Sequence, residues 1–567
     1  MYLKLRSVLF FIVLTLALNI NLYAKPNIVF FFVDDLGYGD MGCFWQDGRN
    51  VSANQKFDTP HLDKMAADGI MLTNHYVAAS VCAPSRGSLL SGRHQGHCDV
   101  RDNQFDKAMA KNHSIGSVLQ EAGYYTAFIG KGGLAGSEKT QLVNYAGTDS
   151  INLPSHPLKQ GFDRFFGYHF HNDGHHHYPK NGMTSKVSVI YDDYRQVIDA
   201  SLDLYTTDAW TAAAKKVIID ESTDGDDQPF FIYLAYDTPH TALHVPTGPY
   251  PPLDNDGDPT TGGIQWTTEK DSSDRVRYAS NADGRSTIDN YIHPSVNPAW
   301  TDNKKRHVTM IRRIDDSVGD IINTLKEIGI DDNTLLIFAS DNGPHGSGGA
   351  NIHKDFESFA NFEGIKRDML EGGIRTPTIV RWPAMITGSG NENNITKVNY
   401  PSGLWDWMPT FAEIAGLPAP AWCDGVSLLP TITGTGTQRD KGYLYFEYVH
   451  KNNTPNWTSH FPNHAGEKRG QQQCIRIGDY MGIRRAISTG KENFSIYDIT
   501  TDTSQGTDLR SSMPDLHAQM QKLAITSRRP NSSAPRPYDS FNLPADELLV
   551  KTLGVSWRSY NGPFPWV

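Results

Sequence analysis

The sequence of 567 residues lacks an excess of basic residues, has few cysteines, and has no apolar run of membrane-spanning length after residue 24. Its formal net charge of -11 argues against nucleic acid or an anionic membrane surface as a general partner. An anionic substrate is compatible with this charge, because a local group of Arg and Lys can dominate the potential inside a cleft. We therefore predict no nucleic-acid partner and no membrane span in the mature chain.

The first residues have the pattern of an export signal. Lys4 and Arg6 supply a positive start, residues 8–20 form an apolar stretch, and Ala24 is a small residue suited to cleavage. The apolar stretch is short for a membrane span and its flanks fit export, although an uncleaved anchor is the alternative. We predict a signal peptide over residues 1–24 and a periplasmic or secreted protein.

The five cysteines are an odd number for an exported chain. At least one of them must then be a free thiol or be chemically altered. They are Cys43, Cys82, Cys98, Cys423 and Cys474. Cys82 is the candidate for the altered residue, for reasons given below.

Four apolar runs end directly in polar, chemically capable residues. The runs cover residues 28–33, 125–129, 230–235 and 335–339. The polar residues that follow them are Asp34 and Asp35, Lys131, Asp237 and His240, and Asp341 and Asn342. Helical patterns lie between the runs, at residues 61–68, 114–122 and 308–325. This alternation predicts an α/β fold, a large and mainly parallel sheet sandwiched by helices, with the polar residues sharing one site beyond the strand ends.

The chain is too long for a single compact core of ordinary size, so we expect a second, smaller unit. Beyond about residue 439 short strand-like pieces appear at residues 442–449, 474–485 and 494–499, followed by a helical pattern at residues 514–527. We predict a catalytic domain over residues 25–438 and a smaller α+β subdomain with an aromatic-rich tail over residues 439–567.

Two further segments stand out by composition. Residues 250–298 are rich in Pro, Gly, Asp and Ser and have little periodicity, which predicts a long surface insertion. Residues 528–567 are rich in Pro but carry Trp557, Tyr560, Phe564 and Trp566. So many aromatic side chains are unusual in a free tail, and we expect this segment to lie on the body of the protein.

The pairs Asp34-Asp35 and Asp341-Asn342 offer hard oxygen ligands, and no Cys or His competes nearby in the sequence. A metal bound by them should be Ca²⁺ or Mg²⁺ rather than zinc, and flexible coordination favours calcium. The alternative is that these residues cap helices or close turns.

Cys82 begins the run Cys82-Ala83-Pro84-Ser85-Arg86. Proline suits the first turn of a helix, so we expect Cys82 at a helix N-terminus, where free N–H groups and the helix dipole attract an anion. A thiol in that position should be acidic and reactive. The alternative is a buried cysteine that acts as a small apolar side chain.

Here the sequence resembles the formylglycine-dependent sulfatases of the alkaline phosphatase superfamily, in particular bacterial polysaccharide sulfatases. The family signature is Cys, any residue, Pro, Ser, Arg, and later Leu-Leu, a small hydroxyl residue, Gly and Arg, and it fits residues 82–93 throughout. Further blocks that resemble the family occur in family order, at residues 26–42, 123–136, 239–240, 340–343, 362–377, 476–480 and 496–498.

The resemblance implies a mechanism and roles for residues. Cys82 would be oxidised by a maturation enzyme to formylglycine, whose hydrate attacks sulfur and then expels the sulfate through its second hydroxyl. One Ca²⁺ per chain would be held by Asp34, Asp35, Asp341 and Asn342. Arg86, Lys131 and Lys366 match family positions that grip the sulfate or stabilise the hydrate, and His240 matches the acid that protonates the leaving alcohol.

One position departs from the family pattern. Many members have His two residues after the active-site Lys, where this sequence has Gly133. Some bacterial members with Gly there add a His before a Tyr-Pro pair, which resembles residues 174–179, and we predict His175 as an additional sulfate contact. A structural role for the His run is one alternative. A separate zinc site is another, although three adjacent side chains cannot all face one metal from regular structure.

We therefore predict a sulfatase that acts on a sulfated polysaccharide or its oligosaccharides, with algal polymers such as ulvan or carrageenan as candidates. Residues 168–178 are dense in His and aromatic side chains that can stack on sugars, and Arg101 could pair with a uronate or a second sulfate. The alternatives are a phosphodiesterase or phosphonate hydrolase of the same superfamily, and a non-catalytic protein that binds sulfated glycans.

Overall fold

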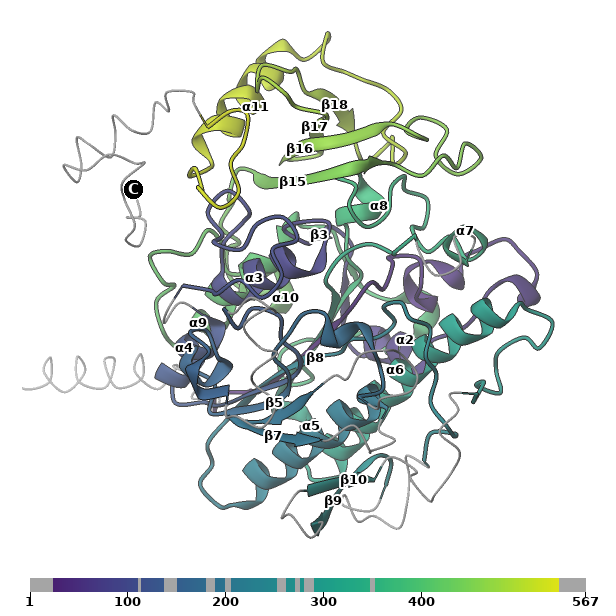
Figure 1. The fold of residues 1–567 in the computed structure, drawn as a ribbon, viewed down its shortest axis with the longest axis vertical. Helices are drawn as coiled ribbons and strands as arrows, with labels where there is room; N and C mark the ends of the chain where they lie inside the picture. The colour runs from purple at the N-terminus through teal and green to yellow at the C-terminus, as the bar shows by residue number, and fades with distance from the viewer. Residues whose placement is uncertain are drawn as a thin grey trace, which may run out of the picture.

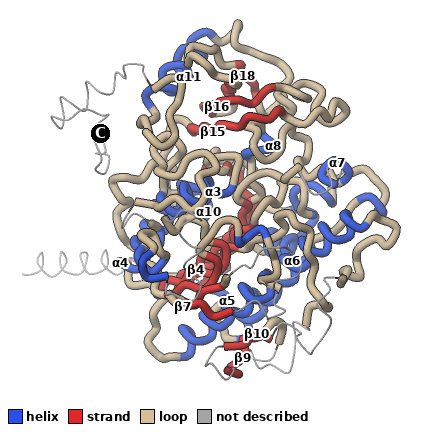
Figure 2. The backbone as a smooth tube through the Cα atoms, in the orientation of Figure 1, coloured by secondary structure: helices blue, strands red, loops and turns tan. Residues whose placement is uncertain are grey.

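A ten-stranded sheet forms the centre of the larger part of the molecule, where its strands appear in red in Figure 2. Five neighbouring strands are parallel, in the spatial order β11 (Thr334–Ser340), β1 (Asn27–Val33), β8 (Phe230–Ala235), β4 (Tyr125–Lys131) and β5 (Arg164–Tyr168). The first four coincide with the four apolar runs of the sequence. Their side chains are apolar without alternation because helices cover both faces of the sheet.

The outer strands make the sheet mixed. On one side lie β12 (Thr378–Arg381) and β2 (Ile70–Leu72), each antiparallel to its inner neighbour, followed by β13 (Lys397–Val398). On the other side lie the antiparallel strands β6 (Ile190–Asp192) and β7 (Arg195–Ile198). The mainly parallel α/β fold predicted from the sequence is confirmed.

The two faces of β1 belong to different apolar clusters. Ile28, Phe30 and Phe32 share a cluster with residues of α3 (Cys82–Ser91), α4 (Ile115–Glu121) and α9 (Trp407–Ile414). Val29, Phe31 and Val33 share the other with residues of α2 (Pro60–Ala67), α5 (Thr206–Thr223) and α6 (Asp302–Glu327). Side chains alternate across a strand, so each apolar run faces both helical layers at once.

The computed structural model describes residues 24–110, 114–136, 150–179, 189–198, 205–251, 262–270, 276–279, 290–346 and 352–539. Residues 1–23 of the predicted signal peptide lie outside these ranges, as do Trp557, Tyr560, Phe564 and Trp566. Among the helices of the described residues, none has both the length and the apolar character needed to cross a membrane. Within the predicted insertion, the described residues include an antiparallel pair, β9 (Gln265–Lys270) and β10 (Val276–Ala279), which the sequence analysis missed.

A smaller antiparallel sheet lies beside the first part of the molecule, at the top of Figure 1 in green and yellow. It consists of β15 (Leu444–Asn453), β16 (Lys468–Ile477), β17 (Tyr480–Arg484) and β18 (Ser495–Asp498), with helix α11 (Pro514–Thr526). The segment predicted as one piece at residues 474–485 is two strands, which Gly478 and Asp479 connect. The predicted α+β subdomain is therefore present.

Strand β15 joins the two parts of the molecule through its alternating side chains. Leu444, Phe446 and Tyr448 belong to the large apolar cluster of the ten-stranded sheet. Tyr445 instead belongs to a separate cluster with Met520 of α11. One face of the small sheet thus packs on the larger part, and this places β15 close to the region of Cys82.

Candidate active site

The carboxyl ends of the parallel strands bring the predicted polar residues together. Asp34 follows β1 and donates its backbone N–H to the Thr238 carbonyl oxygen, 3.1 Å away, just beyond β8. Asp341 follows β11 and donates its backbone N–H to the Val33 carbonyl oxygen at 3.0 Å. The ladder between parallel strands continues past their ends, so these carboxylates lie at the same edge of the sheet.

Asp34, Asp35, Asp341 and Asn342 form a buried group of oxygen-bearing side chains, all at most 2% exposed. The Asn342 Nδ2 atom donates to Asp35 Oδ1 at 2.7 Å, and the Asp35 backbone N–H donates to Asp341 Oδ1 at 3.2 Å. Asp34 Oδ1, Asp35 Oδ2 and Asn342 Oδ1 are buried without a hydrogen-bond partner among the described residues. Such oxygens are costly to bury alone, and the group fits a hard cation such as Ca²⁺.

Each of the three carboxylates also contacts one cationic side chain. Lys131 Nζ pairs with Asp34 Oδ2, and Lys366 Nζ with Asp35 Oδ1 at 2.5 Å. The Arg86 guanidinium contacts Asp341 Oδ2 through Nε and Nη2, both at 2.9 Å. All three cations are at most 2% exposed. The structure thus brings Arg86, Lys131 and Lys366 into one site with the carboxylates.

The carboxylates of the group differ in acidity. Burial opposes ionisation of Asp34, but the charges of Lys131, His240 and Arg86 hold its pKa well below the ordinary value. Burial and repulsion by Asp34 raise the pKa of Asp341 to about 7, even though Arg86 acts in the opposite direction. The protein's own cations therefore do not fully compensate the negative charge at Asp341, which is the condition that a bound cation would relieve.

Cys82 is the first residue of α3, as predicted from Pro84, and is 1% exposed. Its Sγ atom lies 3.2 Å from His171 Nε2 and 3.6 Å from Lys366 Nζ. The prediction of an acidic thiol is wrong: burial raises the pKa of Cys82 to about 11, although Lys366 favours the thiolate. Desolvation outweighs the nearby charge and the helix N-terminus.

Histidine rings form one wall beside this group. His240 Nε2 lies 3.4 Å from Asp35 Oδ2, and the His240 ring stacks on His175 with a centroid distance of 4.3 Å. Burial lowers the pKa of His175, and its Nε2 atom has no hydrogen-bond partner among the described residues. His171, which the sequence analysis did not single out, contacts Cys82 directly. Its only signal was its place in the histidine-rich stretch.

The histidines that follow His175 serve the fold. His177 is fully buried and lies between Asp237 Oδ2, at 3.1 Å from Nδ1, and the His240 carbonyl oxygen, at 2.7 Å from Nε2. His175 and His177 thus face different partners. The structure contradicts the zinc-site alternative for the run, because these side chains diverge.

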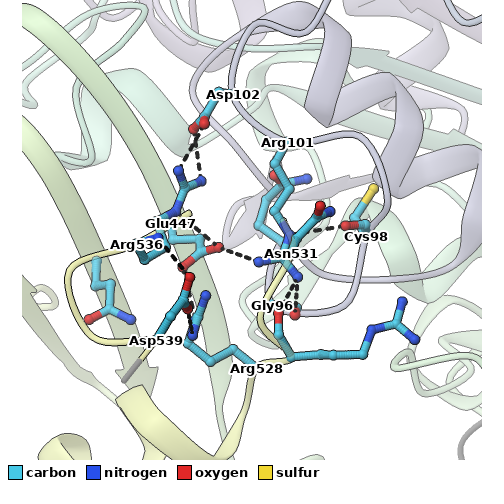
Figure 3. Close-up of polar contacts among 12 residues, drawn as sticks. Gly96, Cys98, Arg101, Asp102, Glu447, Arg528, Asn531, Arg536 and Asp539 are labelled. Carbon is cyan, nitrogen blue, oxygen red and sulfur yellow. Dashed lines mark hydrogen bonds and ion pairs between the residues drawn. The ribbon is translucent and has the colours of Figure 1, made fainter. Parts of the chain in front are cut away.

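Arg101 does not join the group around Cys82. It is fully buried, and its guanidinium donates to Glu447 Oε1 at 3.1 Å and to carbonyl oxygens of Gly96, Cys98 and Arg529 (Figure 3). The predicted contact between Arg101 and a uronate or second sulfate is therefore corrected: its donors are already used inside the protein.

Arg101 belongs instead to a buried ion group that we call the Glu447 node. Arg528 and Arg536 approach the same carboxylate at 3.4 and 3.5 Å, and Tyr538 donates to it at 2.9 Å. The described beginning of the C-terminal tail is thereby held against the strand β15 (Figure 3). The expectation that the tail lies on the body holds for these described residues.

We expect Arg101→Ala to lower the free energy of unfolding by about 3–5 kcal/mol, because it leaves part of a buried ion group unpaired. Burial opposes ionisation of Glu447, but Arg536, Arg528 and Arg101 hold its pKa below the ordinary 4.5. This stabilisation is fully present above pH 4.5 and is lost as the pH falls toward the folded-state pKa.

Urea denaturation at several pH values measures this effect. Lys64→Ala, which breaks an exposed pair with Asp68, is the control and should cost less than about 1 kcal/mol. A variant Arg101→Ala as stable as the wild type but weaker in substrate binding would return Arg101 to the pocket.

A comparison with known families identifies the chain. The family model described as Sulfatase matches residues 26–417. The chain belongs to the sulfatase family. A second model, described as N-sulphoglucosamine sulphohydrolase, C-terminal, matches residues 361–520. The protein is accordingly a sulfuric ester hydrolase, as predicted.

Related sulfatases cover most of the chain. Human N-acetylgalactosamine-6-sulfatase is 26% identical over 448 residues, which are 74% of this chain and 68% of the relative. Human steryl-sulfatase is 24% identical and covers 92% of this chain and 90% of its own. The crystal structure of Ps i-CgsB in complex with k-i-k-neocarrahexaose has the same fold, with a TM-score of 0.61, 21% identity, and coverage of 93% of this chain and 97% of that chain.

Gly133, the position that departs from the family pattern, lies against His171 in this sulfatase. Its φ is +92°, and a Cβ atom there would lie 2.9 Å from His171 Nδ1 and 3.0 Å from His171 Cβ. A side chain at residue 133 would therefore require the His171 ring to move. His171 occupies the space beside Gly133 and reaches Cys82 from it.

We expect Gly133→Ala to reduce kcat/KM about tenfold and to cost about 1–3 kcal/mol of stability, because it displaces His171 and strains the backbone. Gly123→Ala is the matched control. Gly123 has a φ of +86°, and a Cβ atom added there would meet no other atom within 4 Å, so this variant carries the strain without the displacement. Equal kcat/KM for the two variants would exclude a role of the His171 position in turnover.

Proposed function

We propose that this sulfatase removes sulfate from a sulfated polysaccharide or its oligosaccharides, with formylglycine made from Cys82 as nucleophile and Ca²⁺ as cofactor. The observation that carries the proposal is the enclosed group in which Cys82 Sγ lies 3.6 Å from Lys366 Nζ, beside carboxylate and amide oxygens without hydrogen-bond partners among the described residues. A buried thiol with a raised pKa is a poor nucleophile by itself. This favours its conversion to another group before catalysis.

The residues around Cys82 have distinct tasks in this proposal. Asp34, Asp35, Asp341 and Asn342 would hold Ca²⁺, which supplies positive charge against a sulfate oxygen. Formylglycine at residue 82 would supply a hydrated aldehyde that attacks sulfur. Lys131, Lys366 and Arg86 keep the site cationic in a buried setting, where their charges favour binding of an anionic ester.

His240 has the geometry of a proton carrier. Its Nδ1 atom contacts the Thr241 carbonyl oxygen, which leaves Nε2 as the nitrogen on the side of Asp35. Burial and the charges of Lys366 and Lys131 lower the pKa of His240. A proton placed on Nε2 is therefore given up readily, and we propose that His240 delivers it to the leaving alcohol.

The sugar substrate is supported by similarity and by the site's surroundings. N-acetylgalactosamine-6-sulfatase and Ps i-CgsB with its bound neocarrahexaose are named for or contain sugars, whereas steryl-sulfatase is named for a sterol ester. Phe105 is 37% exposed and stacks on His171 at 4.1 Å, which offers an aromatic surface beside Cys82. Aromatic rings of this kind pack on sugar faces.

The export signal at residues 1–24 supports a periplasmic or secreted location, where external polymers or their fragments arrive. The proposal also requires that a maturation enzyme act on Cys82. Sequencing the N-terminus of the protein isolated from its host tests cleavage: a mature chain that begins after residue 24 is expected, and a chain that retains Lys4 and Arg6 contradicts it.

A turnover screen tests the proposed substrate. The protein is produced together with a formylglycine-generating enzyme and incubated with sulfated oligosaccharides, a steryl sulfate, a small aryl sulfate and a phosphonate monoester. We expect kcat/KM for the best glycan to exceed that for the aryl sulfate at least about tenfold, because binding of the remote sugar positions the ester. Equal values for the aryl sulfate, or preference for the phosphonate, would contradict the proposal.

A further inference from the structure

Arg367, the residue after Lys366, has a fixed and unusual backbone. Its φ is +79°, a conformation that costs a residue with a side chain energy unless its surroundings hold it. Its N–H donates to the Ser80 carbonyl oxygen at 2.7 Å, and its own carbonyl oxygen accepts from Gln472 Nε2 at 3.0 Å. Ser80 lies two residues before Cys82 and Gln472 lies on β16. Arg367 is thus fixed between the reaction centre and the small sheet.

The Arg367 side chain is half-buried, and it differs from the other arginines near Cys82 in its partners. Its Nη1 atom donates to His345 Nε2 at 3.0 Å, and His345 Nδ1 lies 3.8 Å from Asp35 Oδ2. Within the part of the chain that the structure describes, no carboxylate forms an ion pair with Arg367. Arg86, in contrast, is paired with Asp341. Arg367 therefore keeps capacity for an anion.

Two rings of β15 lie within the influence of Arg367. Tyr448 and His450 have nearly parallel rings, with an angle of 12° and a centroid distance of 6.2 Å. Burial and then the charge of Arg367 lower the pKa of His450 to about 4, and His450 Nε2 has no hydrogen-bond partner among the described residues. Burial raises the pKa of Tyr448 to about 12, while Arg367 acts against it.

The Glu447 node fixes the position of these rings. Side chains alternate along β15, so Glu447 points away from the face that carries Tyr448 and His450. Asp102 accepts from the Val449 N–H at 3.3 Å and pairs with Arg536 at 2.8 Å. The buried ions on one face of β15 thus hold the other face toward Arg367, and Figure 3 shows this arrangement around Glu447.

We propose that Arg367, together with Tyr448 and His450, forms a subsite for a second anionic group of the substrate, a sulfate or a carboxylate on the same or the adjoining sugar. This inference rests on the proposed hydrolysis of sulfated sugars. A guanidinium presents a planar fork of donors that matches both anions, and a His ring and a phenol can add hydrogen bonds or stack on the sugar. The subsite replaces Arg101 as the reader of a second charge.

The test uses matched sugar substrates that carry the same sulfate ester with or without a second anion. One pair differs by a second sulfate and another by a uronate carboxylate, which separates the two sources of charge. We expect wild-type kcat/KM to favour the dianionic member of at least one pair about tenfold or more, mainly through KM. Arg367→Gln should reduce that preference to about twofold or less, and Arg367→Lys should keep part of it, because the charge remains without the fork.

Arg510→Gln is the control for charge, since Arg510 is exposed and lies before α11. It should leave every kcat/KM ratio as in the wild type. His450→Gln is the second probe, at a half-buried position, and should lower the preference about threefold without the backbone demands of residue 367. Circular dichroism and thermal melting confirm that each variant is folded.

Several outcomes would overturn the subsite. They are a wild type without preference for a second anion, an Arg367→Gln variant with the wild-type preference, and equal loss on all substrates including an aryl sulfate. Failure of the proposed function is distinguishable from these results: the wild type would then hydrolyse the aryl sulfate but none of the sugars.

Discussion

Replacing Cys82 by serine or alanine is expected to lower turnover at least about 10³-fold while the fold stays intact. A serine retains a hydroxyl but not the second hydroxyl of an aldehyde hydrate, so it has no internal route to expel a bound sulfate. Cys82 is small and begins a helix, and its Sγ atom contacts His171 and Lys366 rather than filling a large cavity. The expected loss of stability is about 1 kcal/mol.

The measurements are kinetics, thermal melting and peptide mass spectrometry of the segment that contains Cys82. The control is Cys474→Ala, at a cysteine of β16 that is fully buried in the small sheet, with Sγ 2.9 Å from Met481 Sδ. It should cost stability and keep turnover, the reverse of the Cys82 variants. Fully active protein with only unmodified Cys82 in its mass spectrum would sink the proposal.

The sequence was most informative where one local pattern determined both structure and chemistry. The apolar runs that form β1, β4, β8 and β11 are continuous because both faces of the central sheet are covered. Polar residues directly after such strands meet at one edge of a parallel sheet, so Asp34, Lys131, His240 and Asp341 were expected together from the sequence alone. Pro84 likewise located the start of α3.

The errors concern properties that depend on distant partners. Arg101 and Glu447 are 346 residues apart in the chain, and no local pattern shows that Arg101 is fully buried against it. The acidity of Cys82 was misjudged because the helix start is a local feature, whereas burial comes from the whole fold and dominates the pKa. His171 was missed because the pattern that predicts a sulfate contact, a His before Tyr-Pro, lies in the later part of the same stretch.

Arg367 illustrates the same limit. In the sequence it is one of many basic residues and follows a lysine already assigned to the site. Its positive φ, its bond to His345 and its place beside Tyr448 of the small sheet appear only in three dimensions. The substrate specificity of such a site therefore depends on how the two parts of the molecule pack, which sequence motifs of the catalytic centre alone do not specify.

Removal of the bound metal should have an effect as large as the loss of Cys82. Asp341→Ala is expected to lower kcat at least about 10³-fold, because it deletes one oxygen donor and leaves Arg86 without its carboxylate partner, 2.9 Å away. Chelation of the wild type should abolish activity, and Ca²⁺ should restore it more fully than Mg²⁺. The metal content, measured by elemental analysis, should be one calcium per chain in the wild type and none in Asp341→Ala.

Thermal stability gives a readout that does not depend on turnover. A cation that binds only the folded state stabilises it in proportion to the logarithm of its concentration, by about 2.7 kcal/mol at 100 times Kd. The melting temperature of the wild type should therefore rise with added Ca²⁺, and that of Asp341→Ala should not. The control is Asp331→Asn, at the opposite end of β11, where Asp331 pairs with Arg381 at 2.7 Å. It should lose some stability but keep both the calcium response and the activity, because its carboxylate lies at the other edge of the sheet. Normal activity of Asp341→Ala, or a calcium response that survives in it, would show that Asp34, Asp35, Asp341 and Asn342 do not hold the metal.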